Sequence, residues 1–183
     1  MTEQLKPRSE VSENLKWDLT GIFATEKDFK IALERFPSLV DAFIEQYKGK
    51  IKNAEVVVEA LHIYERIIAE ASYLQQYAML PVNADITDGQ AASKMRSVAT
   101  IISKESAKLS FFDSEVLTLP VSEIDQVEKI EPEFKAWVRK TKKNKKAALA
   151  PEVEEALELL DPVLGSFQEI FEQARSNDPD FGT

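Results

Sequence analysis

The chain contains no cysteine and only one histidine, His62, among its 183 residues. Any zinc site built from two imidazoles is therefore excluded, and a Ser-His-Asp triad would have to use His62 itself. No acidic residue near His62 is distinctive enough to indicate such a triad. The lack of cysteine is compatible with a cytoplasmic protein.

Glycine and long apolar runs are also scarce. The 5 glycines are well below the usual share of roughly 7%, so tight hairpins and phosphate-binding loops have few places to form. No segment approaches the ~20 apolar residues that a membrane helix needs, and residues 1–6 lack the apolar centre of a signal peptide. We expect a cytoplasmic protein without a membrane partner. The net charge of -9 disfavours nucleic acid and anionic lipid as partners of the whole chain.

Apolar residues recur at steps of three and four along most of the chain, which predicts an all-α fold. We expect one domain over residues 1–183, a bundle-like arrangement of elongated antiparallel helical hairpins. The third helix, capped by Thr87 and Gln90, would be roughly 45 Å long. The predicted helices are 25–47, bent or split at Pro37; 53 to Pro81; 87–118; 122–130; a short one from Pro132; one from Pro151; and a last one ending near Asn177.

Residues 139–146 form one strongly basic segment, with six lysines and arginines in total among eight residues. Clustered cations are the electrostatic mark of phosphate or nucleic-acid binding, so RNA binding through this segment is one hypothesis. The other interpretation is a solvated helix end followed by a loop. We favour the second, with no nucleic-acid partner, because no aromatic residues are interleaved for base stacking.

His62 follows Glu59 at the Glu-x-x-His spacing that ferritin-like bundles use to direct a carboxylate and an imidazole at paired metal ions. Such centres need a second unit of the same kind, and one histidine cannot supply it. A mononuclear site or no site remains. We expect no metal ligand here, and a surface histidine between Glu59 and Arg66.

Five further side chains could line a binding surface. Glu105 interrupts an apolar row between Ile102 and Leu109, so it either faces a water-filled chamber or pairs with a cation of a neighbouring helix; we favour the pairing. The aromatic residues could line a peptide groove, but aromatic residues at helical spacing favour a place in the core. These aromatic residues are Trp17, Phe111, Phe112 and Trp137.

The segments Pro7–Val11 and Lys16–Phe23 have an order of residues that helix formation does not require. They resemble the amino-terminal signature of the oligoendopeptidase F family. Four later stretches are similar to that family in the same order along the chain. They are 111–117, an aromatic run followed by Glu and Leu; 131–137, a Glu-Pro-x-aromatic helix start; 149–157; and 176–183.

The resemblance implies the amino-terminal helical domain of a cytoplasmic zinc peptidase, forming one wall of a closed chamber that admits only short peptides. Its partners would be the downstream catalytic domain of the same polypeptide and the peptide substrates. Zinc would be held downstream by a His-Glu-x-x-His helix. We therefore assign no catalytic, metal or cofactor-binding residue to this chain, and its substrate-binding residues are unknown. The alternative is a helical scaffold or adaptor that stands alone and has no enzymatic activity.

Overall fold

The computed structural model describes residues 11–12, 15–147, 163, 165–168 and 170–171. Every regular element among them is helical, which confirms the predicted all-α class. The chain divides into two units, residues 1–141 and 142–183, and the helices of the first are described below. The expectation of one domain over the whole chain stays a prediction. The helix expected from Pro151 and the stretches 7–10, 149–157 and 176–183 lie outside the described residues.

Helix α1 spans Glu26–Tyr47 and begins where the sequence predicts. The Thr25 hydroxyl accepts a hydrogen bond from the Asp28 N–H at 3.2 Å, which satisfies one of the free donors at the helix start. The expected split at Pro37 does not occur, since α1 continues through it. Proline removes one hydrogen bond, but the neighbouring Phe36 and Val40 are fully buried, and their packing stabilises the helix across the gap.

Helix α2 spans Ala54–Ala84, and the Asn53 side chain caps its start by accepting from the Val56 N–H at 3.1 Å. The prediction that Pro81 ends this helix is wrong, because the helix includes Pro81 and three more residues. A proline ring fixes a φ that suits a helix, and its carbonyl can still accept a hydrogen bond. The Pro81 carbonyl does so, from the Asp85 N–H at 3.1 Å.

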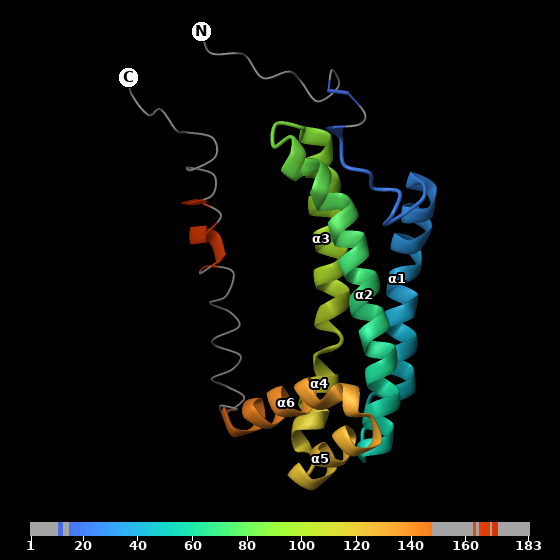
Figure 1. Ribbon diagram of the computed structural model, residues 1–183, viewed down its shortest axis with the longest axis vertical. Coiled ribbons are helices and arrows are strands. Elements are labelled where there is room, and N and C mark those ends of the chain that lie inside the picture. The colour runs from blue at the N-terminus through green and yellow to red at the C-terminus, as the bar shows by residue number, and fades with distance from the viewer. Residues whose placement is uncertain (1–10, 13–14, 148–162, 164, 169, 172–183) are drawn as a thin grey trace. The chain divides into compact units, whose positions relative to one another are not determined.

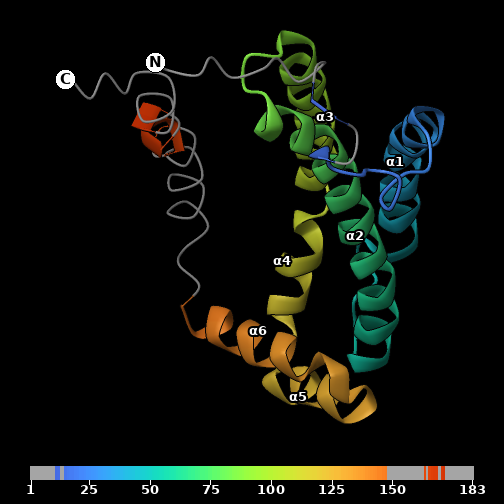
Figure 2. The same ribbon diagram turned by 45° about the horizontal axis from the view of Figure 1, so that its top comes forward.

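The single helix expected over 87–118 is instead two helices, α3 at Gly89–Ala107 and α4 at Ser110–Thr118. Asp88, not Thr87, caps α3 by accepting from two backbone N–H groups. At the break, the Lys108 N–H bonds to the Glu105 carbonyl at 3.1 Å and the Leu109 N–H to the Ser106 carbonyl at 2.9 Å. This three-residue spacing tightens the backbone. Figure 2 shows the resulting interruption between α3 and α4.

Helix α2 is the centre of the first unit, packing against α1, α3 and α5. Figure 1 shows α1, α2 and α3 side by side, with α5 at the end of the bundle where α4 finishes. The antiparallel pairing of α2 with α3 confirms the expected helical hairpin. The remaining elements are α5 at Val121–Ile130, the 3-10 helix η3 at Pro132–Phe134, and α6 at Lys135–Ala147.

The basic segment 139–146 lies inside α6, so the expectation of a loop there is wrong. Lysine and arginine have high helix propensity, and cations in a last turn interact favourably with the helix dipole. Lys145 and Lys146 occupy that last turn. Among the described residues, no helix has both the length and the apolar character needed to cross a membrane.

Candidate functional site

The segment Lys16–Phe23, which carries part of the family resemblance, folds onto the end of α1 and α2 through its aromatic and aliphatic side chains. Phe23 meets Tyr77 edge-on at 5.4 Å between ring centroids and Phe29 at 5.6 Å. Asp18 fixes the preceding turn by accepting from the Thr20 N–H at 2.9 Å and from its hydroxyl at 2.7 Å. These hydrogen bonds lower the pKa of Asp18. The motif therefore has a structural role at this corner.

A charged cluster joins three helices beside this corner. Lys94 of α3 lies 2.7 Å from the Glu26 carboxylate of α1, and the Tyr77 hydroxyl of α2 donates to the same oxygen at 3.3 Å. The Lys94 ammonium also lies 4.4 Å from the centre of the Phe29 ring. Hydrogen bonding to Lys94 lowers the pKa of Glu26, whereas burial raises the pKa of Tyr77. The ion pair and the contact between the ammonium group and the aromatic ring together hold α1, α2 and α3 against one another at this end of the bundle.

We expect Glu26→Gln to destabilise the chain near neutral pH by at most about 1 kcal/mol, because the pair is partly exposed. Since the folded-state pKa of Glu26 lies below the value of 4.5 for the free group, its ionised form stabilises the fold above that pH. This contribution is lost as pH falls through the folded pKa. Urea unfolding at neutral pH and at a pH below the folded-state pKa of Glu26 checks this prediction. Glu34→Gln, at an exposed position of the same helix, is the control. A difference that persists in acid would contradict the charge mechanism.

An open cleft of about 670 Å³ lies next to the corner. Its walls come from the segment before α1, the start of α1, and α2. Trp17 lines it and is 64% exposed, so the expectation that this tryptophan lies in the core is wrong. The cleft volume is within the range of ligand and peptide pockets. Other lining residues are Asp18, Phe23, Thr25, Glu26 and Tyr77.

Of the other three aromatic candidates, Phe111 and Phe112 belong to the buried core as predicted, and Trp137 lies partly buried against it. Phe112 is fully buried, Phe111 is 9% exposed, and Trp137 packs against the buried cluster. In the same family-like stretch, the Glu115 carboxylate accepts from the Gly49 N–H at 2.7 Å and binds the turn between α1 and α2. Gly49 has a φ of 76°, a conformation that favours glycine. The stretch 111–117 thus serves packing and turn stabilisation.

Glu105 is 3% exposed and pairs with Lys108 at 2.6 Å, which confirms that it is a structural ion pair. The partner is the residue that directly follows α3, whereas we had expected a cation of a neighbouring helix. Lys108 also contacts Asp41 of α1 at 2.8 Å. Hydrogen bonding to Asp41 and then to Glu105 raises the pKa of Lys108. One lysine thus neutralises a buried acid and joins α3 to α1.

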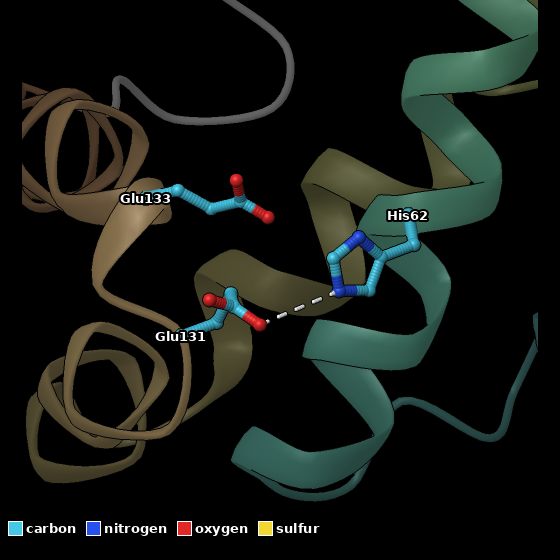
Figure 3. A group of neighbouring side chains, drawn as sticks. All are labelled: His62, Glu131 and Glu133. Atoms are coloured by element: carbon cyan, nitrogen blue, oxygen red, sulfur yellow. Dashed lines mark ion pairs between the residues drawn. The ribbon is translucent and has the colours of Figure 1, made fainter.

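His62 projects from α2 toward the joint between α5 and η3 (Figure 3). As predicted, it is exposed, but its charged neighbour is Glu131, whose Oε2 lies 3.9 Å from His62 Nε2, and not Glu59. Glu133 of η3 completes the group, with one potential ligand atom from each residue lying within 4.8 Å of the others. Figure 3 shows both carboxylates turned toward the imidazole. These three residues, hereafter the His62 group, could hold a cation.

Sequence reasoning missed the His62 group because its members come from separate helices. The Glu-x-x-His pattern directed attention to Glu59, which does not belong to the group. The available signal was the stretch Glu131-Pro132-Glu133, where a helix ends and two carboxylates flank a rigid residue. Only the packing of α5 against α2 brings that stretch to His62. No second imidazole exists in the sequence, so the group cannot form a two-histidine peptidase centre.

No protein-family profile matches the chain, and no solved structure matches it. An oligoendopeptidase F homolog from Borreliella burgdorferi is 27% identical over 178 residues, which cover 96% of this chain. The chain spans 30% of the length of that relative. The resemblance to oligoendopeptidase F predicted from the sequence is thereby confirmed over almost the whole chain.

Proposed function

We propose that this chain is the amino-terminal, non-catalytic helical domain of an oligoendopeptidase F-like zinc metalloendopeptidase of the cytoplasm. In this role it forms one wall of a chamber that restricts substrates to short peptides. One observation carries the proposal: nearly all of the chain matches a protein named as an oligoendopeptidase homolog, yet it corresponds to only 30% of that protein. The rest of such a protein would supply the catalytic domain.

The residues of this chain do not fit a catalytic peptidase zinc. That chemistry uses two imidazoles on one helix turn and a glutamate as general base, and this sequence has one histidine. We therefore place the zinc and the catalytic groups outside this chain. The helices would select substrates by size, since a chamber with a rigid helical wall admits an extended peptide and excludes a folded protein.

The cleft beside Trp17 is the surface that we propose contacts the remainder of the parent polypeptide. Trp17 lines the cleft and is 64% exposed, and a large apolar side chain exposed beside a cleft favours an interaction site. A tryptophan beside a cleft can supply a large share of the binding energy of an interface.

The test uses the chain and, made separately, the remainder of its reading frame, which we expect to continue into a His-Glu-x-x-His helix. The chain alone should not cleave quenched fluorescent peptides with or without zinc. The two pieces should associate, and Trp17→Ala should weaken association by about tenfold or more, as truncating an interface tryptophan does. Titration calorimetry measures the affinity, and the peptide assay measures the restored activity.

Val121→Ala is the matched control, since Val121 is a comparably exposed apolar residue at the start of α5, away from the cleft. It should leave the affinity unchanged. Metal-dependent turnover by the chain alone would contradict a non-catalytic role. A reading frame that stops at Thr183 without a catalytic helix would favour the stand-alone scaffold. Equal losses from both substitutions would remove the cleft from the proposed interface.

A further inference from the structure

We propose that the His62 group binds one divalent transition-metal ion of the zinc class. The ligands would be His62 from α2, Glu131 from the α5–η3 joint and Glu133 from η3. The bound ion would connect two parts of the helical unit that are distant in sequence. This inference stands on the geometry of three side chains and does not depend on the proposed function.

The donor set selects the kind of ion. An imidazole nitrogen with two carboxylate oxygens suits Zn²⁺, Co²⁺ or Ni²⁺, whereas Mg²⁺ and Ca²⁺ favour sites made only of oxygen. Three protein ligands leave a fourth position for water, as in open zinc sites. Because the sequence has no cysteine and no other histidine, no second site with soft ligands competes for such an ion.

The distances between the three potential ligand atoms are close to those found around a bound zinc ion. Ligand atoms around a tetrahedral zinc lie about 3.4 Å apart, given bonds of about 2.0–2.1 Å. His62 Nε2 and Glu131 Oε2 are 3.9 Å apart, and the three ligand atoms all lie within 4.8 Å of one another. The side chains of His62 and Glu131 are 46% and 36% exposed, so rotamer changes of about an ångström can close the set without moving the backbone.

The backbone around the ligands is already fixed. The Glu131 N–H bonds to the Val127 carbonyl at 2.9 Å, and the Glu131 carbonyl accepts from the Phe134 N–H at 3.1 Å. Pro132 restricts the chain between the two glutamates. The His62 ring packs on the buried Phe134 ring at 5.1 Å between centroids. Little backbone entropy is therefore lost when the ion binds, and the ordering cost is confined to the three side chains.

The charge of the group also favours a cation. Among the ion pairs of the described residues, Glu131 has His62 as its basic partner, and Glu133 takes part in none. The neighbouring Lys135 pairs with Glu128 at 3.8 Å. Two carboxylates converging on one imidazole repel each other, and a divalent ion between them would replace that repulsion with attraction.

The experiment is a titration of the full chain, without any affinity tag, with ZnCl₂. We expect one Zn²⁺ per chain by calorimetry and a rise of the thermal unfolding midpoint, since the ion binds the folded state. In proton NMR the ring signals of the one histidine should shift or exchange as zinc is added. Co²⁺ should broaden the same ring signals, because it is paramagnetic. Absence of any His62 response even at about millimolar Zn²⁺ would overturn the proposal.

Variants separate this site from the sequence motif. Glu131→Gln and Glu133→Gln should each weaken Zn²⁺ binding at least about tenfold, and His62→Gln should abolish it. Glu59→Gln is the matched control, because Glu59 precedes His62 on α2 at the Glu-x-x-His spacing but lies outside the group; its affinity should equal that of the unmodified chain. Circular dichroism confirms that each variant is folded. Binding that survives His62→Gln, or that is lost in Glu59→Gln, would overturn the assignment.

Discussion

Replacing Phe43 with alanine is expected to lower the free energy of unfolding by about 3–5 kcal/mol. Phe43 of α1 is 1% exposed, and its ring meets four other aromatic rings. The centroid distances are 5.1 Å to Tyr47, 5.9 Å to Tyr64, and 5.8 Å to both Phe111 and Phe112. Truncation would leave a cavity between α1, α2 and α4 and remove every one of these ring contacts.

Urea unfolding monitored by circular dichroism measures the effect. Ile31→Ala on the same helix is the control, because Ile31 is 53% exposed and should change the free energy of unfolding by about 0.5 kcal/mol or less. Phe43→Leu should give an intermediate loss, since leucine fills part of the space. Similar losses for Phe43→Ala and Ile31→Ala would contradict the position of Phe43 in the core.

Tyr77→Ala is expected to cost about 3 kcal/mol and to loosen the segment Lys16–Phe23. The Tyr77 ring stacks on Phe29 at 4.8 Å, meets Phe23 at 5.4 Å, and lies 4.6 Å from the Lys94 ammonium. Because Phe23 is the main aromatic contact of that segment with the bundle, removing its partner should expose the preceding residues. The cleft beside Trp17 would then lose a wall.

Two measurements check this prediction. Urea unfolding gives the free-energy loss, and limited proteolysis should show faster cleavage within residues 16–23 in Tyr77→Ala. Tyr77→Phe is the control that keeps the ring and removes only the hydrogen bond to Glu26, so it should cost about 1 kcal/mol or less. Equal effects of the two substitutions would show that the hydroxyl, and not the ring, holds the corner. Unchanged proteolysis in Tyr77→Ala would contradict the anchoring of the segment.

Local sequence signals predicted the first two helix starts and the class of the fold. In the structure Thr25 and Asn53 each accept a hydrogen bond from a backbone N–H of the first turn, because a short polar side chain before an apolar row satisfies the free donors of a first turn. The positions of Pro37 and Pro81 were misleading. Each lies within a helix, since neighbouring buried residues and one retained carbonyl bond compensate for the missing N–H.

The break between α3 and α4 could not be predicted from periodicity, because apolar residues continue at helical spacing across it. At the break, Lys108 pairs with Glu105 and also with Asp41 of α1, and the second of these contacts exists only because α1 lies beside α3. The same holds for the exposure of Trp17. Its spacing resembles that of a core aromatic residue, but Phe23 and Tyr77 fill the corner and leave Trp17 at the cleft.

The sequence by itself determined the helical class, the starts of the first two helices and the resemblance to oligoendopeptidase F, because these depend on neighbouring residues and on their order. It also excluded a two-histidine zinc centre, since one histidine was present. The tertiary structure alone decided which distant groups meet. His62 comes to lie next to Glu131 and Glu133 only because α5 packs against α2, and the spacing of residues along one helix carries no information about that contact.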